Sequence, residues 1–544
     1  MNKKISNILF LCILIVTLVF RIIMVFYSPL QFTDADEAVI GIMAKHIMEM
    51  GEIHFFQIGH SFGGDMVVQS LIAVPFFIVF GISTLALHIE AIFLTALVVA
   101  TAYLVFRRVF NEKVALLTAL FLSIPSPVYV EFTRNSSWHI FPLTLDLLLF
   151  FFFYWVFFKK QASSRNLILF GLLSAFSIWV TEFSIPLIII FIVYWFIIDR
   201  RFIFKRSFHA YILSFVIGSL PVIIYNITHK LSNIKHLFAQ SFIHKIVCEY
   251  NLFPSLAYCL DEPVKVSKNI FLFFGNSLPS LFGESIFRFA PYLLLLISIS
   301  YIIHKNRQLF YSVILSFFRK NSAKTKDIHI PIEAAIIFYI LLFAGLFYLR
   351  GADKPRYLLP AYPFFMLVIA IFIAEFSKKI SNMSLKVIFL STIILIIPLV
   401  NLNEASLLYK RPASEIPQIL QVKDVLLANN VIYVYAEYWI KWPIIFESNE
   451  QIIASCDHMC YCLGEGRKSR YPKYEEIVNN SKNFGYVVRE KSEYSRRFKE
   501  YLSMNNVSYN SERIGNFFVY YSLSKEIRPW MINCTDNKIM HPSP

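Results

Sequence analysis

Long apolar runs separated by short polar segments dominate the chain from its N-terminus to about residue 403. A run of about 17 to 25 apolar residues is long enough to cross the hydrocarbon core of a bilayer as an α-helix. By this criterion the chain contains about eleven candidate spans. They are 7–27, 84–106, 113–129, 139–158, 166–180, 183–199, 207–226, 287–304, 331–349, 357–377 and 385–403. The pattern therefore predicts an α-helical polytopic membrane protein.

Basic residues between these runs predict the orientation of the chain, because cytoplasmic loops carry an excess of Lys and Arg. The clusters expected on the cytoplasmic side are Lys3/Lys4, Arg107/Arg108/Lys113, Lys159/Lys160/Arg165, Arg200/Arg201/Lys205/Arg206, the stretch 304–326, and Lys378/Lys379/Lys386. The N-terminus is then cytoplasmic, and an odd number of spans leaves the C-terminus outside. The first run is too long for an ordinary removable signal peptide and lacks a small-residue cleavage site.

The run 66–82 is apolar enough to be a twelfth span. If it crossed, Arg107, Arg108 and Lys113 would lie outside, against the charge rule. We therefore expect a helix that lies in or against the outer leaflet and ends at Gly81.

The tail differs from the rest of the chain. It alternates β-rich runs such as "VIYVYAEYWI" and "NFFVYYSL" with polar helical stretches such as "YPKYEEIVNN". This alternation predicts a small α/β domain. We thus expect a transmembrane domain over 1–403, with a first external loop at 28–83, and an extracytoplasmic α/β domain over 404–544.

Composition agrees with a membrane protein. Of 544 residues, 57% are hydrophobic and 16% charged, whereas soluble domains carry roughly 25% charged residues. The net charge of +15 is divided among short clusters, so a nucleic-acid partner is not expected. Abundant Lys, Ile, Asn and Phe fit a low-GC bacterial source, which suggests the bacterial cytoplasmic (inner) membrane.

Six of the seven cysteines fall in segments expected outside, where disulfides are allowed. Cys248 and Cys259 share one loop and are a plausible pair. The segment "CDHMCYC" could bind zinc through Cys456, His458, Cys460 and Cys462. It lacks a usual ligand spacing, so disulfides or free thiols are favoured over a metal.

Three carboxylates, Asp34, Asp36 and Glu37, crowd the segment "FTDADEAVIG" directly after the first span. The spacing of apolar residues after them predicts a helix over 35–50 that stops at Gly51. Asp34 as the N-cap with Glu37 three residues later resembles a capping box, and acids in a first turn suit the helix dipole. Capping alone would explain Asp34 and Glu37, but it does not require Asp36.

Other polar residues are expected on the same outer face. Asp65 ends the Gly-rich link "GHSFGGD", where we expect it to cap the second loop helix or to face a cavity. Arg350, Lys354 and Arg356 lie within seven residues before a late span, although a salt-bridged loop that includes Asp353 would also explain them. Further candidates for a cavity are Glu131, Arg134, His139, Asp146 and Glu182, and Asp146 and Glu90 occupy spans, where a carboxylate is costly.

Acids and cations on one face of the membrane suggest that the two kinds of residue have different chemical roles in one site. Cations can hold a phosphate, and a carboxylate can take a proton from an attacking hydroxyl group. Because the site would open beside hydrocarbon, the phosphate would belong to a lipid. The sequence contains no P-loop motif, which would have suggested nucleotide binding.

Three segments, "DADEAVIGIMAKHIMEMG", "GGDMVVQSLIAVPFFIVFGISTLALHIEA" and "PRYLLPAYPFF", resemble GT-C class membrane glycosyltransferases. The similarity covers roughly residues 1–403 and is strongest to the family of protein O-mannosyltransferases and lipid A aminoarabinose transferases. The resemblance implies that Asp36 is the catalytic or metal-organising acid, with Glu37 beside it. It also implies that Arg356 and Tyr357 lie at the donor phosphate. A Lys-Pro-Pro motif of some relatives is missing, which leaves Lys354, Arg350 or Arg134 for further phosphate contacts.

The resemblance predicts an inverting transfer of a sugar from a polyprenyl-phosphate donor to a hydroxyl group of a glycan, lipid or protein acceptor. Asp36 would be the base, and Arg and Lys would neutralise the leaving phosphate. Oxygen ligands from Asp34, Asp36, Glu37 and Asp65 could bind Mg²⁺ or Mn²⁺.

Two other functions remain open from the sequence. A transporter or flippase of lipid-linked sugars would use similar charges, but such proteins usually contain two related halves, which the chain does not show. A non-catalytic membrane protein that presents the external α/β domain would leave the acids unexplained.

Overall fold

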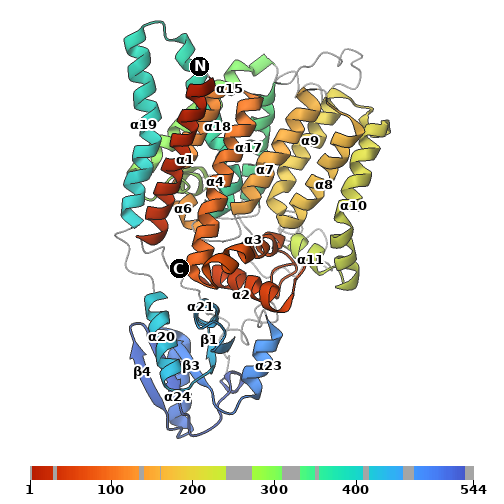
Figure 1. Ribbon diagram of the computed structural model, residues 1–544. Coiled ribbons are helices and arrows are strands. Elements are labelled where there is room, and N and C mark those ends of the chain that lie inside the picture. The colour runs from red at the N-terminus through yellow and green to blue at the C-terminus, as the bar shows by residue number, and fades with distance from the viewer. Residues whose placement is uncertain are drawn as a thin grey trace.

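The computed structural model describes residues 3–27, 33–133, 140–159, 161–239, 273–308, 331–349, 355–408, 416–456 and 471–532. Apolar helices form a bundle, and a small α/β domain lies against one end of it (Figure 1). The N-terminus lies at the opposite end. This is the predicted class: a polytopic α-helical protein with a small C-terminal sheet region.

Every predicted span coincides with one or two apolar helices. They are α1 (Lys3–Phe26), α4 (Thr84–Val109), α5 (Glu112–Ser123) with α6 (Pro127–Thr133), α7 (Ile140–Phe153) with the π-helical turn η2 (Tyr154–Phe158), α8 (Ser164–Val180), α9 (Ile185–Ile198), α10 (Arg206–Thr228), α15 (Phe289–Lys305), α17 (Ile332–Leu349), α18 (Tyr362–Lys379) and α19 (Met383–Leu408). Shorter elements in this region are η3 (Glu182–Ser184), η4 (Phe202–Phe204), α11 (Ser232–Ala239), η5 (Phe273–Ser277), α14 (Leu278–Ser280), η6 (Ile286–Arg288) and η8 (Pro355–Ala361).

Within the described residues, seven helices are long and apolar enough to cross a membrane, and α5 with α6 makes an eighth if that bent pair is one span. The pair is bent by 74°. Helices α8, α9 and α17 are apolar but shorter. The chain is therefore an integral membrane protein, and the count of eleven crossings stays a prediction.

The loop after α1, which the sequence predicts to be external, forms two helices, α2 (Ala35–Met50) and α3 (Gly64–Phe80). Both lie across the end of the bundle rather than along it (Figure 1). Gly51 ends α2 in the left-handed conformation, with φ of 66°, which glycine adopts without steric cost. Gly81 ends α3. Local sequence signals therefore place these helix ends correctly.

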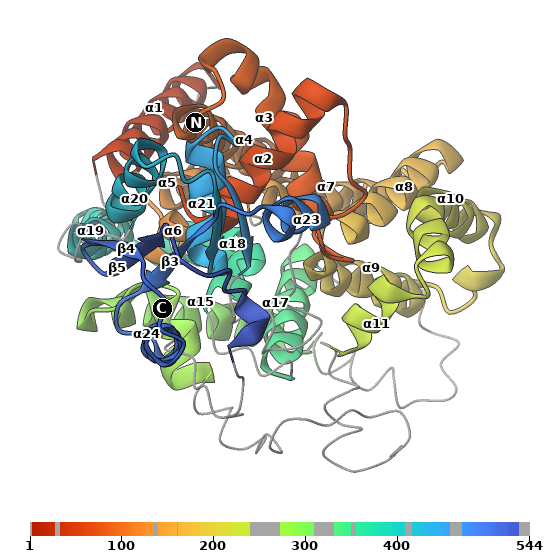
Figure 2. The same ribbon diagram turned by 90° about the horizontal axis from the view of Figure 1, so that it is seen from below.

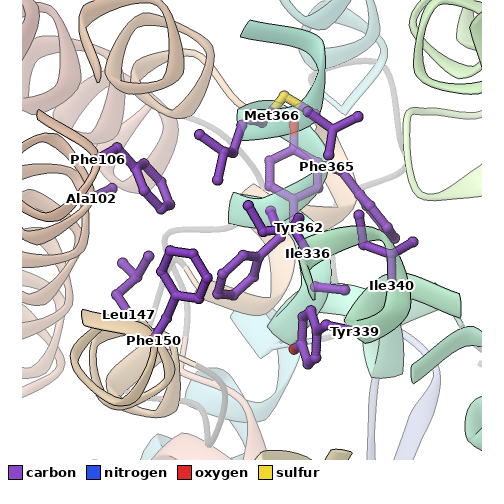
Figure 3. Close-up of a cluster of buried hydrophobic side chains, with 14 of the residues drawn as sticks. Ala102, Phe106, Leu147, Phe150, Ile336, Tyr339, Ile340, Tyr362, Phe365 and Met366 are labelled. Atoms are coloured by element: carbon purple, nitrogen blue, oxygen red, sulfur yellow. The ribbon is translucent and has the colours of Figure 1, made fainter. Parts of the chain in front are cut away.

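Aromatic and branched side chains fill the centre of the bundle. Figure 3 shows Phe106 of α4, Phe150 of α7, Tyr339 of α17 and Tyr362 of α18 facing one another. All four are nearly or completely buried. Ring pairs such as Phe150–Phe364, with centroids 5.4 Å apart, adopt the edge-to-face geometry that the aromatic quadrupole favours. This core supports the end of the bundle on which the loop helices rest.

The tail forms a five-stranded sheet in the order β2-β1-β3-β5-β4. Strands β1 (Tyr433–Ala436), β2 (Ile453–Cys456) and β3 (Gly485–Arg489) are parallel, while β5 (Phe517–Tyr521) pairs antiparallel with β3 and with β4 (Asn510–Ile514). The helical elements of the tail are α20 (Ile416–Ala428), α21 (Tyr438–Glu447), α23 (Pro472–Asn480), α24 (Glu493–Met504) and η10 (Pro529–Met531). A mixed sheet with interspersed helices matches the predicted α/β alternation.

The tail packs directly on the first loop. Helix α21 lies beside α2 (Figure 2), and one hydrophobic cluster unites α2 and α3 with α20, α21 and the sheet. Gly41 permits this approach, because a Cβ atom there would stand 2.4 Å from Cε2 of Phe446. The loop helices therefore lie between the spans and the tail.

Candidate functional site

The three carboxylates at the start of α2, those of Asp34, Asp36 and Glu37, point in different directions. Asp34 is the N-cap, and its Oδ1 accepts a hydrogen bond of 2.9 Å from the Glu37 amide. Glu37 is completely buried, and its Oε1 lies 3.5 Å from Nε2 of His88 on α4. Asp36 is half-buried and faces the tail, where its Oδ1 accepts a hydrogen bond of 2.6 Å from the Tyr438 hydroxyl group. Of the three acids, Asp36 thus remains the candidate base.

Asp65 lies in the first turn of α3 with 1% of its surface exposed. Asp65 is not the N-cap residue, since Gly63 takes that position with a φ of 82° that favours glycine, but the Asp65 carboxylate does accept hydrogen bonds from the backbone amides of Asp65 and Met66 in the first turn. Burial, together with the carboxylates of Glu182 and Asp36, raises the pKa of Asp65 well above its ordinary value. Asp65 therefore belongs to one electrostatic group with Asp36 and Glu182.

A close backbone contact brings Asp65 to Glu182. A Cβ atom on Gly64 would stand 2.3 Å from the carbonyl oxygen of Trp179. The start of α3 consequently packs on the end of α8, just before the turn η3 that carries Glu182. Asp146 of α7 supports this turn, because its Oδ1 accepts a hydrogen bond of 2.6 Å from the Ser184 hydroxyl group. Asp146 is thus a support for the turn inside the bundle, as its 1% exposure shows.

The predicted cation lies on the other side of the same turn. Arg356 is the second residue of η8. It stacks over the rings of Tyr357 at 5.0 Å and Phe132 at 5.6 Å, and it donates a hydrogen bond of 3.1 Å to the Tyr357 hydroxyl group. The Tyr357 ring packs against Phe183, with centroids 5.9 Å apart. Since Phe183 follows Glu182, this ring contact joins the segment that carries Arg356 to the η3 turn.

Tyr438 is the member of this group that the sequence does not reveal. It lies 402 residues from Asp36, at the first position of α21. Aromatic residues in short amphipathic stretches are common, and its own neighbours, Trp439 and Trp442, do not distinguish it. A hydroxyl group aimed at a loop acid is visible only in the folded chain.

Several predicted candidates fall outside the described residues. They are Arg134, His139, Arg350 and Lys354. Cys248, Cys259, His458, Cys460 and Cys462 do as well, while Cys456 at the end of β2 is disulfide-bonded. Glu131 and Glu90 lie in α6 and α4, the former half-buried and the latter completely buried.

No three His, Cys, Asp or Glu side chains of the described residues lie close enough together to hold a metal ion. Asp36 and Glu37 in particular diverge, the first toward α21 and the second toward α4. The divalent cation stays a prediction, and no step below is routed through one.

Comparison with known proteins agrees with the predicted fold class. Residues 67–225 match the family model described as dolichyl-phosphate-mannose-protein mannosyltransferase. The crystal structure of ArnT from Cupriavidus metallidurans bound to undecaprenyl phosphate superposes with a TM-score of 0.59 at 11% identity, over 96% of this chain and 99% of ArnT. This chain has the fold of the GT-C class glycosyltransferases.

A second solved structure has the same fold. The oligosaccharyltransferase from Archaeoglobus fulgidus, in complex with Zn and sulfate, has a TM-score of 0.54 at 12% identity, over 94% of this chain and 73% of its own. No curated protein sequence matches the chain. The predicted GT-C class is confirmed at the level of the fold.

Proposed function

We propose that the protein transfers a sugar from a polyprenyl-phosphate-linked donor to a hydroxyl group at the extracytoplasmic face of the bacterial cytoplasmic membrane. Two observations carry the proposal: Asp36, Asp65 and Glu182 interact electrostatically, and the Tyr357–Phe183 contact joins the segment of Arg356 to the turn that carries Glu182. A family match to mannosyltransferases and a GT-C fold support transferase chemistry. ArnT, the relative crystallised with undecaprenyl phosphate, supports a lipid phosphate as the leaving group.

In the proposed reaction, the acceptor oxygen attacks the anomeric carbon of the donor sugar in one inverting displacement. Asp36 takes the proton of the attacking hydroxyl group. The bond between the anomeric carbon and the phosphate oxygen breaks, and its electron pair remains on that oxygen. A phosphate that leaves in this way needs neutralised charge rather than a separate acid.

Arg356 would supply that neutralisation. Its planar guanidinium group can bind two phosphate oxygens at once. Stacking on the rings of Phe132 and Tyr357, together with the hydrogen bond to Tyr357, holds this group in one orientation. Arg350, Lys354 and Arg134 remain further candidates for the same phosphate. Asp65 and Glu182 would face the sugar between the base and the cation.

Transfer can be tested with purified protein in detergent. The donors are undecaprenyl-phosphate-linked mannose, glucose, galactose and aminoarabinose, and membranes from cells that lack the gene provide the acceptor. We expect wild-type protein to transfer one of these sugars and Asp36→Asn to be slower by about 10²- to 10⁴-fold, the usual contribution of general acid–base catalysis. Asp424→Asn, a change at an exposed tail residue, should transfer at the wild-type rate.

Two results would contradict the proposal. A folded Asp36→Asn protein that transfers sugar normally would reject Asp36 as the base. Movement of the lipid-linked sugar across reconstituted vesicles, without any transfer by wild-type protein, would identify a flippase instead.

A further inference from the structure

The tail reaches the candidate base through one hydroxyl group. Tyr438 donates to Oδ1 of Asp36 over 2.6 Å, a length typical of a hydrogen bond to a charged oxygen. Such a bond fixes the plane of the carboxylate and therefore the direction in which Oδ2 points. A general base works only when its accepting oxygen is within hydrogen-bond reach of the proton that it removes.

Tyr438 itself is held in place by its surroundings. Its ring contacts Trp439 edge-on, with centroids 5.2 Å apart, and Trp442, with centroids 6.5 Å apart. Trp442 is completely buried. A side chain locked by packing can position another group, whereas a mobile one cannot.

Helix α21 is in turn anchored to α2 along its length. Phe446 packs on Gly41 in the middle of α2 and against Phe77 of α3. Just beyond the end of α21, the Lys45 amine lies 2.6 Å from a carboxylate oxygen of Glu450 and donates a hydrogen bond of 3.0 Å to the Asn449 carbonyl oxygen. The position of Tyr438 relative to Asp36 is therefore set by an extended interface.

We propose that Tyr438 is a positioning residue for Asp36, so that the tail domain completes the active site instead of only covering it. This inference rests on the proposed function, in which Asp36 is the base. It assigns a role in catalysis to a domain outside residues 67–225, the part of the chain that matches the mannosyltransferase family model. It also predicts that the membrane domain without α21 holds an incorrectly oriented base.

The pH dependence of transfer distinguishes positioning from simple attachment of the tail. The hydrogen bond stabilises the ionised carboxylate of Asp36, so its loss moves the acid limb of the rate profile to higher pH. Other titratable groups around Asp36 are Asp34 and Glu37 of α2, Asp65 of α3, His88 of α4, Glu182 of η3 and Glu447 of α21. All are the same in wild type and variant, so a difference between the two profiles reports the bond to Tyr438.

The experiment compares Tyr438→Phe with Tyr471→Phe. Tyr471 also donates a tail hydrogen bond to a loop acid, 2.9 Å to Oε2 of Glu52, but Glu52 is not part of the candidate site. With the donor that wild-type protein uses, Tyr438→Phe should lower kcat about tenfold, which is the value of about one hydrogen bond to a charged group. It should move the acid limb of the pH–rate profile to higher pH and leave the donor KM unchanged. Tyr471→Phe should change neither kcat nor the profile.

A second variant keeps the test decisive if Tyr438→Phe is poorly folded. Incorporation of 3-fluorotyrosine at position 438 makes the phenol a stronger donor of the same shape, so the acid limb should move to lower pH. Wild-type kcat and an unchanged profile in folded Tyr438→Phe would overturn the inference. If Asp36→Asn abolishes transfer while Tyr438→Phe does not affect it, the proposed function stands and the positioning role fails. If Asp36→Asn has no effect, the proposed function fails first.

Discussion

Tyr357 and Phe183 pack against each other with ring centroids 5.9 Å apart. This contact joins the segment that carries Arg356 to the turn that carries Glu182. Asp65 and Asp36 lie beyond that turn, within electrostatic reach of each other. The segment of Arg356 is thus joined, through one aromatic contact, to the turn beside the acids, although Arg356 follows Asp36 by 320 residues in the sequence.

Replacement of Arg356 by lysine should weaken donor binding. Lysine keeps the positive charge but loses the planar fork that binds two phosphate oxygens and stacks on Tyr357 and Phe132. We expect the donor KM to rise about tenfold, as for the loss of one charge-assisted hydrogen bond. Arg513→Lys, on an exposed strand of the tail, should leave KM unchanged. A wild-type KM for Arg356→Lys would remove Arg356 from the phosphate site.

Asp65→Asn should make the protein more stable near neutral pH and less active. The pKa of Asp65 is raised by burial and by its neighbours from an ordinary value of 3.8, so folding is penalised as pH rises above 3.8 toward the folded pKa. Asparagine removes this penalty, and we therefore expect a gain in stability at pH 7. The gain should vanish near pH 3. Thermal unfolding at both pH values measures it, with Asp424→Asn as the exposed control.

Gly64→Ala should disturb the meeting of α3 with the η3 turn. The added methyl group would lie 2.3 Å from the carbonyl oxygen of Trp179, and backbone atoms must move to admit it. We expect a loss of roughly 1–3 kcal/mol of stability, typical of overpacking, and at least a tenfold loss of transfer because Asp65 moves relative to Glu182. Gly345→Ala in α17, where no atom lies within 4 Å of the added carbon, is the matched control. Equal activity of the two variants would show that this contact does not position the site.

Glu450→Gln should loosen the tail from α2 in a pH-dependent way. Burial opposes ionisation of Glu450, but hydrogen bonds from His46, Lys45 and Tyr474 outweigh it and lower the pKa from 4.5 to about 2. A depressed carboxylate pKa stabilises the fold above pH 4.5, and the effect is lost as pH falls from 4.5 to about 2. We expect Glu450→Gln to cost roughly 1–3 kcal/mol at pH 7, with the difference from wild type shrinking through that window.

The control for this change is Glu500→Gln, which removes an exposed ion pair with Arg496. Exposed pairs contribute about 0–1 kcal/mol, so this variant should unfold close to wild type at every pH. If Glu450→Gln behaves in the same way, the cluster around His46 does not hold the tail.

Local features of the site were readable from the sequence. The N-cap at Asp34, the stop at Gly51 and the helix end at Gly81 follow from rules that involve only neighbouring residues. The sequence also predicts that Asp36 and Arg356 lie on the same face of the membrane, because each span can be recognised from its own hydropathy and each loop assigned to a side from its own charge. It leaves Asp65 open between a cap and a cavity, and the structure places Gly63 at the N-cap and buries Asp65 in the first turn.

The sequence by itself determined the apolar helices, the loop helices α2 and α3 and the α/β alternation of the tail, since run length, periodicity and caps are local properties. Only the tertiary structure decided which acid faces the site. Successive residues of a helix point about 100° apart, so Asp36 faces Tyr438 of α21 while Glu37 faces His88 of α4. The hydrogen bond from Tyr438 to Asp36 also depends on tertiary structure. Contacts between distant segments depend on how whole helices pack, and no local pattern encodes them.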